Sequence, residues 1–155
     1  MSIYFFDDAI IDPTVYPWGY GFFVPPYLIE SLLYGGTITT TRSPSTGSIE
    51  NILDNDESTS AYYSTDAETS ITRDFGQKVY IKKIRARFGT GSDSSRTHRI
   101  EVSSDNSNWT VIATGDWRHE LSEWFNVEAE YRYVRLAKTG DNWHEYFILN
   151  VMGRV

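Results

Sequence analysis

From Ile49 to the end of the chain, apolar and polar residues alternate in short runs that are separated by turn residues, and no helical period lasts for three turns. Ile84, Ala86 and Phe88, for example, are separated by single arginines. An alternation of period two gives a strand one buried face and one wet face. Short strands of this kind, joined by polar turns, predict an all-β domain.

The chain before this domain has a different composition. Its first 44 residues hold all five prolines and ten of the twenty-four aromatic residues. Proline fixes φ and removes a backbone donor, so this part is predicted to be an extended arm. So many aromatic rings would expose more apolar surface than a monomer usually tolerates, so we expect the arm to pack on the main domain or on another chain. We therefore divide the chain into an arm, residues 1–48, and a β-domain, residues 49–155.

One short helix is predicted inside the arm. Pro26 suits a helix start, apolar residues follow at helical spacing from Leu28 to Leu33, and Gly35 with Gly36 suits a stop. The threonine-rich stretch that follows predicts a strand that runs into a loop.

Charge and composition exclude several classes of protein. The net charge of −7 repels phosphate backbones, so we expect no nucleic-acid partner. Lys83, Arg85 and Arg87 share one strand face; nucleic-acid binding is one interpretation, and a solvated sheet face balanced by acids is the one that the net charge favours. The absence of cysteine removes disulfides, thiolate metal sites and cysteine nucleophiles.

We expect neither a signal peptide nor a membrane-spanning helix. Asp7 and Asp8 stand where a secretory leader needs positive charge. No run of eighteen apolar residues occurs. The sequence thus predicts a protein that is soluble or belongs to a soluble particle, such as a virion.

Catalysis has no support in the sequence. The usual motifs for acyl transfer, zinc hydrolysis and phosphate binding are missing. The three histidines share no metal-ligand spacing. We expect a protein that is not an enzyme.

Four segments, in order, resemble motifs of the discoidin or coagulation factor 5/8 type C domains, which overlap with galactose-binding-like carbohydrate-binding modules. Ile52–Thr59 (ILDNDEST) resembles "LDGDxxT", and Ile71–Gly76 (ITRDFG) resembles "IxxDLG". Arg99–Thr110 (RIEVSSDNSNWT) resembles the hairpin "YxIexSxDGxNWt", and Tyr131–Leu136 (YRYVRL) resembles "aRYVRL". The resemblance covers residues 49–153 and implies an antiparallel jelly-roll β-sandwich with ligands bound in loops at one end.

In the carbohydrate-binding members of this family, the first of these segments holds a structural Ca²⁺. The resemblance would assign Asp54, Asp56, Thr59 and Glu145 as its ligands here, because hard oxygen atoms suit that ion. The alternative is that Asp54 and Asp56 only make turn hydrogen bonds. Ile148 stands where the family has a liganding glutamate, and tyrosines replace the tryptophan that follows the family's threonine.

Three loops carry the candidate ligand-binding residues, namely residues 89–98, 115–124 and 139–146. Aromatic rings can stack on a sugar, and histidine, arginine and asparagine can bond its hydroxyl groups. The candidates are Arg96, His98, Trp117, Arg118, His119, Asn142, Trp143 and His144. The alternative for Trp117 and Trp124 is a hydrophobic cap on the sandwich or burial under the aromatic arm.

Two functions fit these observations. The first is a structural or attachment component of a larger particle, of the phage or virion type, in which residues 1–48 contact other subunits or further copies of the chain and the displayed domain contacts surface glycans. The second is a carbohydrate-binding or adhesion module that targets a cell surface or a partner enzyme. The long aromatic arm favours the first function.

Overall fold

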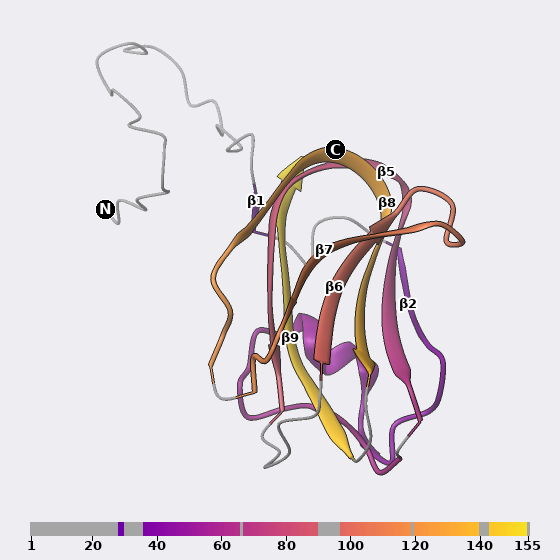
Figure 1. The fold of residues 1–155 in the computed structure, drawn as a ribbon, viewed down its shortest axis with the longest axis vertical. Helices are drawn as coiled ribbons and strands as arrows, with labels where there is room; N and C mark the ends of the chain where they lie inside the picture. Colours follow the sequence, from indigo (N-terminus) through magenta and orange to yellow (C-terminus); the bar gives the residue numbers. More distant parts are fainter. Residues whose placement is uncertain are drawn as a thin grey trace, which may run out of the picture.

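The computed structural model describes residues 28–29, 36–65, 67–89, 97–118, 120–139 and 143–154. Nearly all of these residues form antiparallel β-structure (Figure 1). The strands are β1 (Leu28–Ile29), β2 (Thr37–Thr40), β3 (Thr46–Gly47), β4 (Ala61–Tyr63), β5 (Thr69–Phe88), β6 (Thr97–Ser103), β7 (Trp109–Gly115), β8 (Phe125–Thr139) and β9 (His144–Arg154). A 3₁₀ turn, η1 (Ile49–Leu53), precedes β4. The described part is all-β, as the alternation predicts, and forms the sandwich that the family resemblance implies.

The two longest strands, β5 and β8, belong to both layers of the sandwich. The strand order is β3-β4-β9-β5-β8-β6-β7, with β1 added to β9 and β2 added to β5. The first half of β5 pairs with β2 and the second half of β8, whereas its second half pairs with β9 and the first half of β8. Figure 1 shows both strands curving over at the same end of the molecule. The two layers are therefore joined by continuous backbone.

The bend of β5 is fixed by Asp74 and Gly76. Pairing with β8 is interrupted between Asp74 and Val79, and Gly76 has a φ of +77°, which an L side chain rarely adopts. The Asp74 carboxylate accepts the Gly76 N–H at 2.7 Å and both Nε and Nη2 of Arg132 on β8, at 2.8 and 2.9 Å. One carboxylate thus stabilises the turn of one strand and ties it to the other.

The core lies between the layers and follows the predicted alternation. On β5, Ile84, Ala86 and Phe88 are fully buried, and Arg85 and Arg87 point out of the core. A register shift between Ile81 and Lys83 lets both halves of the strand present apolar side chains inward. The core cluster also takes residues from η1, β4, the rest of β5, β6, β8 and β9, namely Ile52, Ala61, Tyr63, Ile71, Phe75, Val79, Ile81, Ile100, Val102, Val134, Leu136, Tyr146, Leu149 and Val151.

The predicted hairpin is present between β6 and β7. Asp105 accepts the backbone N–H groups of Ser107 and Asn108 and the side-chain amide of Asn108, and these bonds hold the pKa of Asp105 well below its usual value. Asn106 has a φ of +62° at the place where the family motif has glycine. Asparagine tolerates this left-handed conformation, so the turn is kept despite the substitution.

The prediction of a helix in the arm is wrong for Leu28 and Ile29, the two residues of that helix that the structure describes. Leu28 and Ile29 form β1, which pairs with Gly153 and Met152 of β9. The edge of β9 offers unpaired backbone groups there, and bonding to them outweighs a weak helical propensity. The other residues of that helix, like most of the arm, lie outside the described residues. Within the described residues, no helix is long and apolar enough to cross a membrane.

Replacing Asp74 with asparagine should weaken the bend. We expect the free energy of unfolding at neutral pH to fall by roughly 1 kcal/mol, because the Arg132 pair is partly solvent-screened. The Arg132 hydrogen bonds lower the pKa of Asp74 in the folded state, so its contribution is complete above the ordinary aspartate pKa of about 3.9 and fades as the pH falls through the folded value. Urea unfolding of Asp74→Asn and of the parent protein should therefore give curves that differ at pH 7 and converge in acid. Equal stability at pH 7 would contradict this role.

Candidate functional site

One end of the sandwich, called here the loop end, collects the ends of six strands. Residue pairs across the sheet place the starts of β5, β6 and β9 beside the ends of β4, β7 and β8; Thr97 lies opposite Thr139, for example, and Tyr63 opposite His144. The loops at residues 89–98 and 139–146 begin and finish at this end, whereas the loop at residues 115–124 begins there and runs along the sheet to Phe125, opposite Ile84. Of the candidate residues, Arg96, His119 and Asn142 lie outside the described residues.

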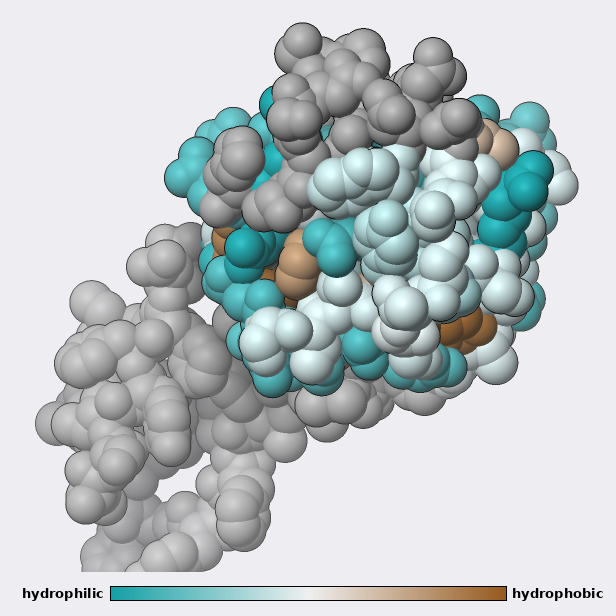
Figure 2. Space-filling view, turned by 90° about the horizontal axis from the view of Figure 1, so that it is seen from below, coloured by the Kyte–Doolittle hydropathy of each residue, from teal (hydrophilic) through white to brown (hydrophobic). Residues whose placement is uncertain are grey.

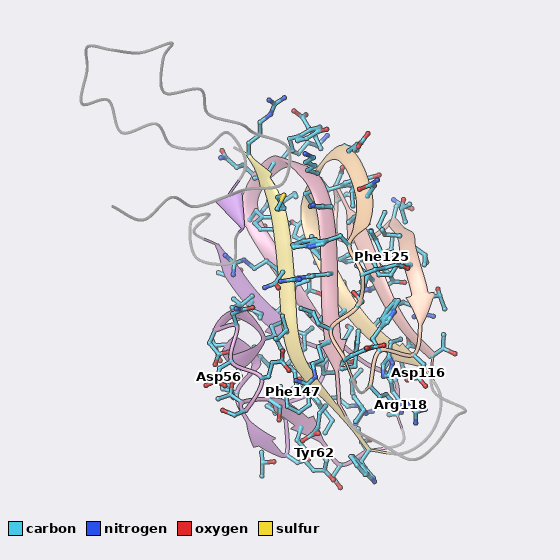
Figure 3. All side chains as sticks on the ribbon, turned by 90° about the vertical axis from the view of Figure 1, so that its left-hand side faces the viewer. Asp56, Tyr62, Asp116, Arg118, Phe125 and Phe147 are labelled. Carbon is cyan, nitrogen blue, oxygen red and sulfur yellow. The ribbon has the colours of Figure 1, made fainter. Side chains whose placement is uncertain are left out.

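Among the candidate side chains that the structure describes, Trp143 has the largest exposed fraction. It is 39% exposed, which is unusual for a tryptophan, and it immediately precedes β9. Its ring contacts that of Tyr62 on β4, with centroids 5.7 Å apart and planes inclined by 51°. Figure 3 shows Tyr62 at the bottom of the domain, with Asp116 and Arg118 on the neighbouring side. An exposed aromatic pair of this kind offers a surface on which a flat apolar face can stack.

A buried group of polar aromatic side chains lies directly behind Trp143. The rings of Tyr63 and His144 are stacked, with centroids 5.2 Å apart and planes 2° from parallel, and Tyr146 meets both of them edge-on. The Tyr146 hydroxyl donates to the backbone oxygen of Thr69 at 2.8 Å, and the Thr69 hydroxyl bonds the His144 ring. Burial raises the pKa of Tyr146 far above its usual value. This network fixes the backbone that carries Trp143.

His98 and His144 are both buried, so the structure places them beneath the loop end and not on its surface. The His98 ring stacks on Phe88 with centroids 4.1 Å apart. Trp117 likewise packs inward, against Phe88 and Phe125, which agrees with the alternative of a hydrophobic cap. These three candidate residues support the loop end from below.

Arg118 is held in place by Asp116, two residues before it. The guanidinium donates through Nε and Nη2 to the two carboxylate oxygens, and the Arg118 side chain is only 11% exposed. Gly115 leaves room for the neighbouring Trp117 ring, because a Cβ there would lie 2.8 Å from it. The exposed carboxylate of Asp116 is thus the accessible half of the pair.

The surface of the loop end is polar. Figure 2 views the molecule from this side and shows mainly hydrophilic and intermediate residues, with small separate hydrophobic areas. A surface of this composition suits a ligand rich in hydroxyl groups better than a lipid or an apolar peptide.

Tyr62 was not among the residues predicted from the sequence. It stands between Ala61 and Tyr63, both buried, so the alternation in this short strand predicts that its side chain points outward. What the sequence did not reveal is the contact with Trp143, because the two residues are far apart in the chain.

The candidate calcium residues make hydrogen bonds within their own loop and beside it. Asp54 accepts the Asp56 N–H at 2.8 Å and the Thr59 hydroxyl at 2.7 Å, whereas Glu145 accepts the hydroxyl of Ser60. Among the described residues, no three acidic or histidine side chains are grouped to hold a metal ion. Ca²⁺ takes six to eight oxygen ligands, and here the Asp54 and Asp56 carboxylates instead accept hydrogen bonds from their own loop. The geometry agrees with the alternative, in which the aspartates make turn hydrogen bonds.

Comparison with known protein families gives one match. The F5/8 type C domain model matches residues 37–151. Among curated proteins, no sequence matches the chain.

Several solved structures share this fold. Chitosan-binding module 1, derived from a chitosanase/glucanase of Paenibacillus sp. IK-5, is 19% identical, with a TM-score of 0.62 over 76% of this chain and 94% of that module. The CBM32 of AlyQ, in complex with 4,5-unsaturated mannuronic acid, is 20% identical, with a TM-score of 0.60 over 76% and 95%. A CBM32 from Clostridium perfringens, in complex with GalNAc-β-1,3-galactose, is 19% identical, with a TM-score of 0.60 over 74% and 93%. At these identities, the likeness establishes the fold.

The buried tyrosine behind Trp143 should contribute strongly to stability. Replacing Tyr146 with phenylalanine removes the donor to the buried Thr69 backbone oxygen, so we expect the free energy of unfolding to fall by about 1–3 kcal/mol. Tyr62→Phe is the matched control, because that ring is only partly buried, and its change should stay within about 0.5 kcal/mol. Chemical denaturation measures both; equal losses would show that the hydrogen bond is not the cause.

Proposed function

The chain belongs to the F5/8 type C domain family, and from this membership we propose that it is a non-catalytic module that binds a carbohydrate at the loop end. The observation that carries the proposal is the exposed Trp143 ring beside Tyr62, mounted on a buried hydrogen-bonded framework. A sugar ring stacks one of its C–H faces on an aromatic side chain, while polar neighbours bond its hydroxyl groups. Glu145, which lies opposite Tyr62 on the neighbouring strand, offers an acceptor for those hydroxyl groups.

A rigid support favours this kind of recognition. Binding costs less when the contacting side chains are already ordered, and the packed Tyr63, His144 and Tyr146 rings fix the strand that carries Tyr62 and the strand that follows Trp143. A small site of this kind gives weak binding: a millimolar affinity corresponds to about 4 kcal/mol. We therefore expect useful attachment to come from several sites acting together, either in repeated copies of this chain or in a longer protein.

The similar structures favour a binding module over the particle component that the arm suggested. The three named above are a chitosan-binding module and two CBM32 modules. The role of residues 1–48 in assembly stays a prediction, and the molar mass of the full chain in solution is its test. A defined oligomer would support it, and a monomer would contradict it.

Loss of the Trp143 ring should abolish most carbohydrate binding. We expect Trp143→Ala to weaken binding by at least about tenfold, since aromatic stacking contributes on the order of 1 kcal/mol or more, and Trp143→Phe to retain part of it. Glycan-array screening with galactose-type, glucosamine-type and uronate oligosaccharides identifies the ligand, and calorimetry then compares the variants. The net charge of −7 disfavours anionic chains, so neutral or amino sugars should bind better than uronates.

Trp109→Ala is the matched control, because Trp109 starts β7 at the opposite end of the sandwich. Its affinity should equal that of the parent protein. Equal loss in the two alanine variants, or full affinity in Trp143→Ala, would overturn the placement of the site.

A further inference from the structure

The loop at residues 54–59, called here the acidic loop, is fastened to the outer face of the β5–β9 sheet by two arginines. Arg87 on β5 donates through Nη1 to the Glu57 carboxylate, and its guanidinium lies over the Phe147 ring, 4.9 Å from the centroid. The Arg87 side chain is 14% exposed, so this ion pair has one largely buried partner. Figure 3 shows Asp56 of the acidic loop beside the same face as Phe147.

The second fastening runs through two amide side chains. Arg85 donates through Nε to the Asn150 side-chain oxygen at 3.0 Å, and the Asn150 amide donates to the side-chain oxygen of Asn55 at 3.3 Å. Asn150 is buried, and Asn55 has a φ of +58°, a conformation that asparagine tolerates at modest cost. The relay therefore holds the tight turn of the acidic loop against β9.

The remaining acidic groups of the loop are satisfied from within it. The Asp54 carboxylate takes the Asp56 N–H and the Thr59 hydroxyl, and Asp56 takes the N–H and hydroxyl of Ser58, which lower its pKa. Glu57 also acts electrostatically on Arg85, opposing the fall in pKa that burial imposes on that guanidinium. The positive charge that balances this loop is thus supplied by the protein chain itself.

We propose that Arg85 and Arg87 form an arginine clamp that keeps the acidic loop folded without a divalent cation. Two guanidinium groups on the adjacent sheet face repel a metal ion from this position and replace the attraction that it would give. Because the loop continues through Ser60 into β4, the clamp also sets the position of the strand that carries Tyr62. The domain should then present its loop end equally well with or without calcium.

Thermal unfolding of the full chain tests the proposal. The melting temperature should be the same in EDTA and in excess CaCl₂. Glu57→Gln and Arg87→Gln should each lower it by about 2 °C or more, because each removes the ion pair. The charge-swapped double variant Glu57→Arg/Arg87→Glu should recover more of the melting temperature than the sum of its single variants predicts.

Two further measurements distinguish loss of the arginine clamp from the general effect of removing one charge. Glu130→Gln removes an exposed glutamate on β8 and should leave the melting temperature unchanged. In Arg87→Gln, the amide hydrogens of Asp56 and Ser58 should exchange faster, while those of β6 keep their protection. A melting temperature that rises with CaCl₂ or falls with EDTA would overturn the proposal, as would equal effects of Glu57→Gln and Glu130→Gln.

Discussion

The passage of β5 and β8 from one layer of the sandwich to the other is the constraint on which the rest of the structure depends. Two continuous strands can serve both layers only if they bend together, and the bidentate Asp74–Arg132 pair joins them at the bend. Their two halves then present apolar residues to one shared core. Because both strands turn over at the same end, the free strand ends collect at the other, and the loop end exists for that reason.

Recognition and support are divided between different side chains at the loop end. Trp143 and Tyr62 reach the surface, whereas Tyr63, His144 and Tyr146 are buried and hydrogen-bonded or stacked behind them. A polar network in a buried position is costly unless its groups are paired, so it also specifies one arrangement of the backbone. The acidic loop adds a second support from the side. Its Glu57 is paired with Arg87 on the sheet, and Arg85 is linked to the same loop through Asn150.

More of the fold than of the candidate site could be predicted from the sequence. Alternation along Ile84–Phe88 and the Asp105 turn depend on neighbours in the chain, and both are seen in the structure. By contrast, histidine is a residue type that often binds ligands, so the sequence favours His98 and His144 as candidates. Only the tertiary packing shows that both are buried. The Tyr62–Trp143 and Glu57–Arg87 contacts join distant segments, and no local pattern encodes such pairs. β1 was mistaken for a helix because its partner, the edge of β9, lies more than a hundred residues away.

The central claim is that a carbohydrate contacts the loop end, and an NMR titration tests it most directly. The five tryptophans give five indole N–H signals, so one spectrum samples both ends of the sandwich. On addition of the best glycan, the account predicts saturable shifts of the Trp143 indole and of the backbone amides of Tyr62 and Gly89, with the Trp109 indole unchanged. Shifts centred on Trp109 and its hairpin, with Trp143 unaffected, would contradict the account.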